Sequence, residues 1–265
     1  QLAALTTSDL SVFNANQIRA LSADQISLLS TNQIEGMKRG QFSSLTSEQL
    51  ASLTTAQVAA IETYDLGGLS GAQVNALSTD QVQALRTQQM AALTQLQLAA
   101  LGEEQVVALS SAQIQAITPQ TVPALTTRQV VSMSATQVSK FTNAQIAALN
   151  TDSVAALLTE QLAALSTTQI QAMQQQQVAA LTTSQLASLG TSQILALDTQ
   201  DIVALTANQV AALTSDQLNA MSTSQIGAIE ARDVASMSTT QVSALATQQI
   251  AAMTSVQLSA LLTDQ

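Results

Sequence analysis

The chain has 265 residues, of which 9% are charged, and a net charge of −10. It contains no His, Cys or Trp and only seven Lys and Arg, so it lacks the usual general base, thiol nucleophiles and a basic surface for nucleic acid. No apolar run approaches the ~20 residues that span a bilayer. We therefore expect no metal or cofactor, no nucleic-acid partner and no membrane insertion.

From Thr6 to Leu261 the sequence repeats every eight residues without insertion or deletion. The octad reads Ser/Thr-x-x-Gln-[Val/Ile/Leu]-x-Ala-Leu. All 32 octads have large apolar residues at positions five and eight, 26 have Gln at position four, 20 have Ser or Thr at position one, and 22 have Ala at position seven. Partial repeats flank both ends. The pattern predicts one octapeptide-repeat array over residues 1–265, which we interpret as a fragment of a longer array because neither end resembles a capping repeat.

The octad has the features of a helix N-terminus. If Thr54 is an N-cap, Gln57 is the third helical residue, and the two form a capping box. Leu53 and Val58 then occupy the two positions of a hydrophobic staple. Each octad has room for a helix of only about 1.5 turns, too short to be stable alone. The sequence therefore predicts an all-α repeat solenoid, a superhelix of very short N-capped helices with one helix per octad.

Two other structures have the same period. In a continuous helix the apolar pair would drift by roughly 80° per octad, so no stripe would persist. A β-solenoid remains the alternative because Val, Ile and Thr favour strands, although positions five and eight would lie on opposite faces of a strand. When every third octad is grouped, one set departs from Ser/Thr at position one only at Gly190, whereas the other two sets depart six and five times. This grouping favours three octads per coil.

Two irregular places lie in the first third of the chain. Residues 35–42 replace the Ser/Thr cap by Lys38 and Arg39, which we interpret as a drifted repeat in preference to an anion or partner contact. Residues 62–71 contain three Gly and the only Tyr, Tyr64. Because Gly weakens a helix, we expect a loosened repeat here in preference to a contact loop.

Two further places follow along the chain. In residues 118–125, Pro119 suits a first helical position, but Pro123 removes a helical donor. We expect a kink there in preference to a ligand site. Gln174 to Gln177 form a run of four Gln, which we interpret as low-complexity drift.

The chain offers little for catalysis. No His is present to activate a Ser or Thr, and the three Phe occupy core positions of the motif. Three carboxylate pairs occupy positions one and four of their octads, so we expect substituted capping boxes in preference to acid–base pairs: Glu62/Asp65, Asp198/Asp201 and Glu230/Asp233. Glu103 and Glu104 form a further local pair. The sequence thus predicts no catalytic, cofactor-binding or metal-binding residue, and no enzyme.

Octads such as Thr142 to Leu149 resemble the Ala-Leu-Thr-Thr-x-Gln-Val-type octapeptide-repeat arrays of very large bacterial surface and type I-secreted proteins. The resemblance covers the whole chain. It implies a stalk or spacer between neighbouring domains of a larger parent chain, and an extracellular or cell-surface location. It transfers no active-site residue, because the repeat carries none.

We therefore expect a structural spacer, stalk or scaffold, with end-to-end or lateral self-association as a further option. The alternative is a binding module whose repetitive face meets a polysaccharide, a peptide or a surface. Positions two, three and six change freely among Ser, Thr, Ala, Gln, Asn and Val. A binding face would concentrate aromatic residues or Arg, so this variation favours the spacer.

Overall fold

A computed structural model describes residues 5–265, and the partial repeat at residues 1–4 lies outside the described part. Each octad forms one short helix, and no strand forms anywhere from residue 5 onward. The predicted all-α array is confirmed, and the β-solenoid alternative is not supported. The chain divides into two compact units, Gln1–Met133 and Ser134–Gln265, and each unit is described by itself.

The first unit contains fifteen α-helices and one 3-10 helix, η2: α1 (Thr7–Ser11), α2 (Ala15–Arg19), α3 (Ala23–Ser27), α4 (Thr31–Glu35), α5 (Arg39–Phe42), α6 (Ser47–Ala51), α7 (Thr55–Ala60), α8 (Thr63–Leu66), α9 (Gly71–Asn75), α10 (Thr79–Gln83), α11 (Thr87–Ala91), α12 (Gln95–Ala100), α13 (Glu103–Val107), α14 (Ser111–Ala116), η2 (Val122–Ala124) and α15 (Thr127–Ser132), as described from residue 5.

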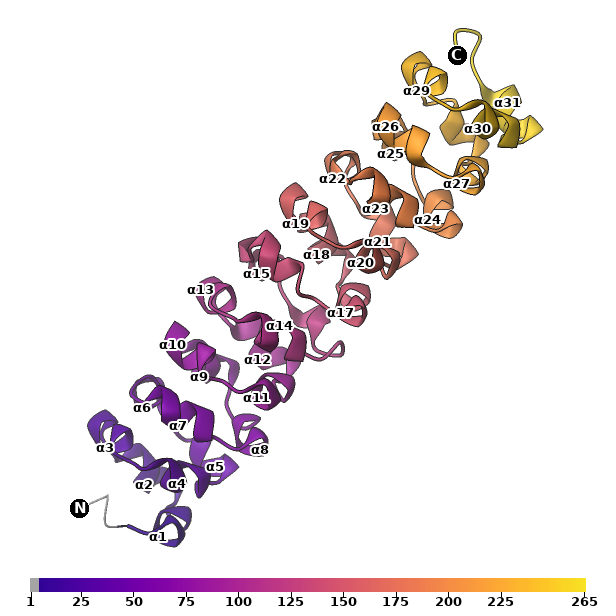
Figure 1. Cartoon of the computed structure of the whole chain (residues 1–265). Coiled ribbons are helices and arrows are strands. Elements are labelled where there is room, and N and C mark those ends of the chain that lie inside the picture. The colour runs from indigo at the N-terminus through magenta and orange to yellow at the C-terminus, as the bar shows by residue number, and fades with distance from the viewer. Residues whose placement is uncertain (1–4) are drawn as a thin grey trace. The chain divides into compact units, whose positions relative to one another are not determined.

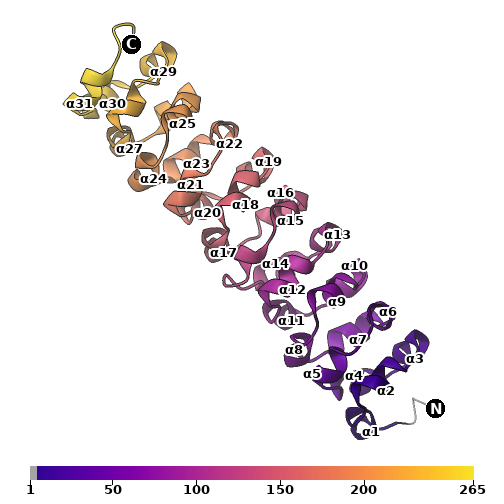
Figure 2. The ribbon, with the colours of Figure 1, turned by 180° about the vertical axis from the view of Figure 1, so that it is seen from behind.

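The second unit is built in the same way from α16 (Ala135–Val138), α17 (Asn143–Ala148), α18 (Thr151–Ala156), α19 (Thr159–Ala163), α20 (Thr167–Gln171), α21 (Gln175–Ala179), α22 (Thr183–Ser188), α23 (Thr191–Ala196), α24 (Thr199–Val203), α25 (Ala207–Ala212), α26 (Ser215–Ala220), α27 (Thr223–Ala228), α28 (Ala231–Val234), α29 (Thr239–Ser243), α30 (Thr247–Ala252) and α31 (Ser255–Ala260). Within each unit the helices follow one another in chain order (Figures 1 and 2).

Helix α7 shows why an octad folds as it does. The Thr54 hydroxyl accepts from the Gln57 backbone N–H at 3.2 Å, and the Gln57 Oε1 accepts from the Thr54 N–H at 2.7 Å. The staple positions Leu53 and Val58 are both buried. The helix ends because Ile61 is extended, with φ −61° and ψ 128°, which leads the chain into the next N-cap. The predicted capping box is therefore present in this octad.

Helices three octads apart pack against each other. In the first unit α3 contacts α6 and α4 contacts α7, and in the second unit α20 contacts α23 and α24 contacts α27. Three octads therefore form one coil of 24 residues, as the grouping of position one predicted. Most residues at positions five and eight are buried and form the core of each unit, with exceptions toward the ends of the array such as Leu258. Each buried Leu, Ile or Val contributes about 1.5–3 kcal/mol.

Glutamine at position four also links octads that lie 32 residues apart. The Gln57 Nε2 donates to the carbonyls of Leu29 at 2.7 Å and Ile26 at 3.0 Å. These carbonyls lie at the end of α3, where a short helix leaves its last C=O groups without intrahelical donors. Gln57 is 2% exposed. One amide therefore caps the start of its own helix and the end of an earlier one.

The same register recurs in both units. Gln113 in the first unit donates to Val82 and Leu85, at 2.8 and 2.9 Å. Gln217 in the second unit donates to the carbonyls 31 and 28 residues before it, at 2.9 and 2.7 Å. These bonds satisfy buried polar groups on both sides of the coil contact, so each link adds polar bonding to the apolar packing.

Candidate functional site

The two irregular places in the first third of the chain lie against each other. The Arg39 guanidinium sits 5.0 Å from the centre of the Tyr64 ring, and its Nη2 donates to the Gly67 carbonyl at 2.8 Å. Tyr64 is 71% exposed, so this cation–π pair is a surface feature worth about 0.5–1 kcal/mol. Nothing in the sequence pattern alone indicated that the two places are in contact. The 24-residue coil places them together, because Tyr64 follows Arg39 by 25 positions.

Gly68 makes this close approach possible. It occupies position seven, where most octads have Ala. A Cβ at Gly68 would lie 2.5 Å from the Arg39 Cγ and 2.9 Å from the Arg39 carbonyl oxygen. Such distances are too short for unbonded atoms. Gly68 therefore leaves room for Arg39 to pack against it, so the Gly at this position has a packing role.

Of the three carboxylate pairs, one forms the predicted capping box. The Asp198 backbone N–H donates to the Asp201 Oδ2 at 3.0 Å, and the Asp201 N–H donates to the Asp198 Oδ1 at 2.8 Å. Asp201 is 4% exposed. Burial is the main cause that raises the pKa of Asp201. The hydrogen bond from the Asp198 backbone lowers this pKa, and the negative charge of Asp198 raises it further.

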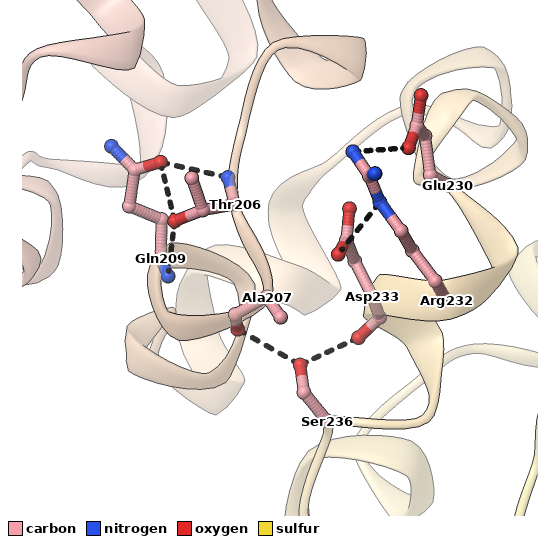
Figure 3. Close-up of polar contacts among 7 residues, drawn as sticks. All are labelled: Thr206, Ala207, Gln209, Glu230, Arg232, Asp233 and Ser236. Atoms are coloured by element: carbon pink, nitrogen blue, oxygen red, sulfur yellow. Dashed lines mark hydrogen bonds and ion pairs between the residues drawn. The ribbon is translucent and has the colours of Figure 1, made fainter.

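The capping-box prediction is wrong for Glu230/Asp233. The Glu230 side chain makes no cap hydrogen bond and instead pairs with Arg232 at 2.6 Å, while the Arg232 Nε lies 3.5 Å from the Asp233 Oδ1 (Figure 3). Glu is longer than Ser or Thr, and Arg232 forms ion pairs with both carboxylates in place of the reciprocal cap bonds. Asp233 is nonetheless 2% exposed, and burial raises its pKa, with Arg232 opposing that shift.

The prediction is also wrong for Glu62/Asp65. Glu62 makes no side-chain cap bond at the start of α8, and the carboxylate at position four lies near Arg39 of the previous coil. Burial is the main cause that raises the pKa of Asp65, and a backbone hydrogen bond from Arg39 opposes it. A backbone N–H of the adjacent coil thus takes the place of the reciprocal cap bond to Asp65.

A serine at position seven makes another contact between coils. The Ser236 hydroxyl shares its one proton between the Ala207 carbonyl at 2.9 Å and the Asp233 carbonyl at 2.6 Å, next to the Thr206–Gln209 cap (Figure 3). Ser52 occupies the corresponding position in the first unit and donates to Ala23 at 2.9 Å. These hydroxyls strengthen packing between helices that are three octads apart.

The octad with two prolines loses its α-helix. Residues 119–121 form a turn, and Val122–Ala124 form the 3-10 helix η2. We expected a helix with a kink. The change is larger, because Pro123 lacks the donor that an α-helix would use there. Val122 and Leu125 stay buried, so the apolar core continues through this octad.

The remaining candidates are also parts of regular octads. Gln177 is buried and bonds to the carbonyls of Ile146 and Leu149, whereas Gln174 to Gln176 are exposed. Glu103 and Glu104 lie in the first turn of α13, beside an open surface groove lined by Asn75 and Gly102. Within residues 5–265 no cluster of three or more His, Cys, Asp or Glu suits a metal ion. No described helix is long and apolar enough to cross a membrane.

Sequence reasoning missed the second role of the position-four Gln. A capping box accepts Glu as readily as Gln, yet 26 of the 32 octads have Gln and none has Glu. This preference was the available signal. Only the amide offers an acceptor for its own helix together with donors for carbonyls of an earlier octad.

These features define a class of protein: a repeat protein built from short capped helices, with three octads in each coil and amide links between coils. The model of the ALTTAQ repeat family matches residues 2–39, 58–95, 154–191, 194–228 and 226–263, which together make up more than half of the chain. The chain therefore belongs to the ALTTAQ repeat family. A comparison with curated proteins finds no match.

Proposed function

We propose that the array is a structural spacer or scaffold within a larger exported protein, and that it performs no catalysis. The proposal rests on one observation: the recurring positions of the octad form the helix caps, the links between coils and the core. In α7, Thr54 and Gln57 serve the caps and coil links, and Val58 and Ile61 form the core. Thr55 and Ala56, at the variable positions two and three, are exposed and take no part in these contacts. The recurring part of the sequence thus maintains the fold.

The nature of the polar groups supports a role without catalysis. No His or Cys is present in the chain. The buried carboxylate of Asp201 is part of a helix cap, and Asp233 pairs with Arg232. The hydroxyl of Thr54 is likewise engaged with its own helix. Each of these groups has a structural partner that accounts for its position.

The exported location rests on the resemblance of octads such as Thr142 to Leu149 to arrays of large bacterial surface and type I-secreted proteins. A spacer in such a protein would connect domains on either side of the array. Stability in a one-dimensional array grows with the number of coils, because each coil gains most of its stability from its neighbours. This property suits a segment whose length is set by repeat number.

Small-angle X-ray scattering of the chain tests the proposal. A spacer must hold its ends apart, so we expect a radius of gyration well above the ~18 Å of a globule of this length and below the ~57 Å of an unfolded chain. A value near ~18 Å would contradict a spacer.

A further inference from the structure

Asp201 and Asp233 occupy position four, where other octads use Gln to link coils. Each Gln at position four donates to carbonyls 28 and 31 residues before it, so it links its own octad to the octad that begins 32 residues earlier. The octads of Asp201 and Asp233 begin 32 residues apart, so they are partners in one such link. By this register a Gln at position 201 would donate to the carbonyls of Met173 and Ile170. A Gln at position 233 would donate to those of Leu205 and Ile202, which belong to the octad that contains Asp201.

An ionised Asp cannot make these links. The Nε2 of Gln169, one link earlier on the same line, donates to the Phe141 carbonyl at 2.7 Å. A carboxylate has only acceptor oxygens, whereas a carboxylic acid has one O–H donor. No residue in the described part of the chain donates a hydrogen bond to the carbonyl oxygen of Met173 or Leu205. An ionised Asp at position four therefore leaves these two carbonyl oxygens without the donor that Gln provides at the equivalent links.

We propose that Asp201 and Asp233 make two consecutive coil contacts of the second unit proton-dependent, so that these contacts tighten when the carboxyls take up protons and loosen when they ionise. The proton comes from solvent and binds a carboxylate oxygen. The resulting O–H gives the contact a donor in the place where Gln provides one. The inference is independent of whether the array serves as a spacer.

Few other charges face these groups. Helix α24, which carries Asp201, packs against α21 and α27, and neither helix contains a titratable residue. The charge closest to Asp201 is Asp198 of its own cap. Helix α28, which carries Asp233, packs against α25 and α31, which are also uncharged. Its charged neighbours are Glu230 and Arg232 of its own octad.

The direction of the pH effect follows from burial. Burial raises the pKa of both Asp201 and Asp233 in the folded chain, because it disfavours the charged form. The folded state then binds protons more tightly than the unfolded state. The stabilisation is fully present below the unfolded pKa of about 4 and is lost as pH rises through the raised folded pKa.

Hydrogen exchange of the full chain at pH 7 and pH 4, corrected for intrinsic rates, tests this proposal. We expect acidification to raise amide protection in α20 to α28 by roughly 5- to 30-fold per site, which corresponds to one or two kcal/mol. The double variant Asp201→Gln/Asp233→Gln, which restores the common residue, should already be protected at pH 7 and respond little to acid. A second double variant, Asp201→Asn/Asp233→Asn, should also lose the response.

The matched control is Asp216→Asn, which removes an exposed carboxylate from the same unit. It should keep the wild-type response to acid. The proposal is overturned if the wild type and both double variants gain the same protection on acidification. It is also overturned if the Gln variant is no better protected than the wild type at pH 7.

Discussion

Replacing Gln57 by Glu separates the two roles of the position-four amide. Glu has nearly the same shape and serves equally well in a capping box, so the Oε1 contact with Thr54 is kept. The change removes the Nε2 donor and places an anion against the carbonyls of Ile26 and Leu29, now 3.0 and 2.7 Å from the amide nitrogen. The variant therefore changes the link between octads and leaves the cap intact.

The expected cost is large. The bonds lost are worth about 1 kcal/mol each, and an unpaired charge in a site that is 2% exposed raises the cost to about 3–5 kcal/mol at neutral pH. Burial raises the pKa of the new carboxyl, so part of this cost should be relieved as pH falls through that raised value, and the relief is complete below the unfolded pKa of about 4. If the cap were the only role of Gln57, the same substitution would change stability by less than about 0.5 kcal/mol.

Gln25 provides the control for this experiment. It lies 32 residues before Gln57, accepts from the Ser22 N–H at 2.8 Å in an equivalent capping box, and is exposed. Hydrogen exchange in α3 to α7 is the assay, because a repeat array need not unfold in two states. We expect Gln57→Glu to lower protection by roughly 10²- to 10⁴-fold and Gln25→Glu to leave it unchanged. Equal effects of the two variants would refute the link.

Three further changes test the packing. Ile146→Asp buries an unpaired charge at a residue that is 1% exposed and should cost at least about 3 kcal/mol in chemical denaturation; a neutral effect would contradict the staple. Gly68→Ala should destabilise by about 1–3 kcal/mol through overpacking against Arg39, and a higher midpoint would argue against that contact. Arg39→Ala should cost about 0.5–1 kcal/mol and alter the fluorescence of Tyr64, the only Tyr; unchanged emission would count against the pair.

The local structure of the octad was predictable because its determinants are close in sequence. Thr54, Gln57 and Val58 lie within one helical turn, so the cap, the staple position and the helix start follow from spacing alone. The number of octads per coil was a weaker prediction, since it depended on one substitution pattern. The 24-residue coil then explains which distant residues meet.

The contacts between coils were the part that the sequence did not predict. Gln57 reaches carbonyls 28 and 31 residues away, and those distances follow only once the coil length is known. The pairs Glu230/Asp233 and Glu62/Asp65 failed as capping boxes: Arg232 forms ion pairs with both carboxylates of the first pair, and Asp65 accepts a hydrogen bond from the Arg39 backbone of an earlier octad. Position within an octad does not reveal such partners.

The most direct test of the amide links is the exchange rate of Gln side-chain protons, measured by NMR. Gln88 and Gln89 are neighbours in α11, but Gln88 is exposed, whereas Gln89 is 0% exposed and donates to the carbonyls of Val58 and Ile61 at 2.9 and 2.8 Å. We expect the Nε2 protons of Gln89 to exchange far more slowly than those of Gln88. Similar rates for the two side chains would contradict it.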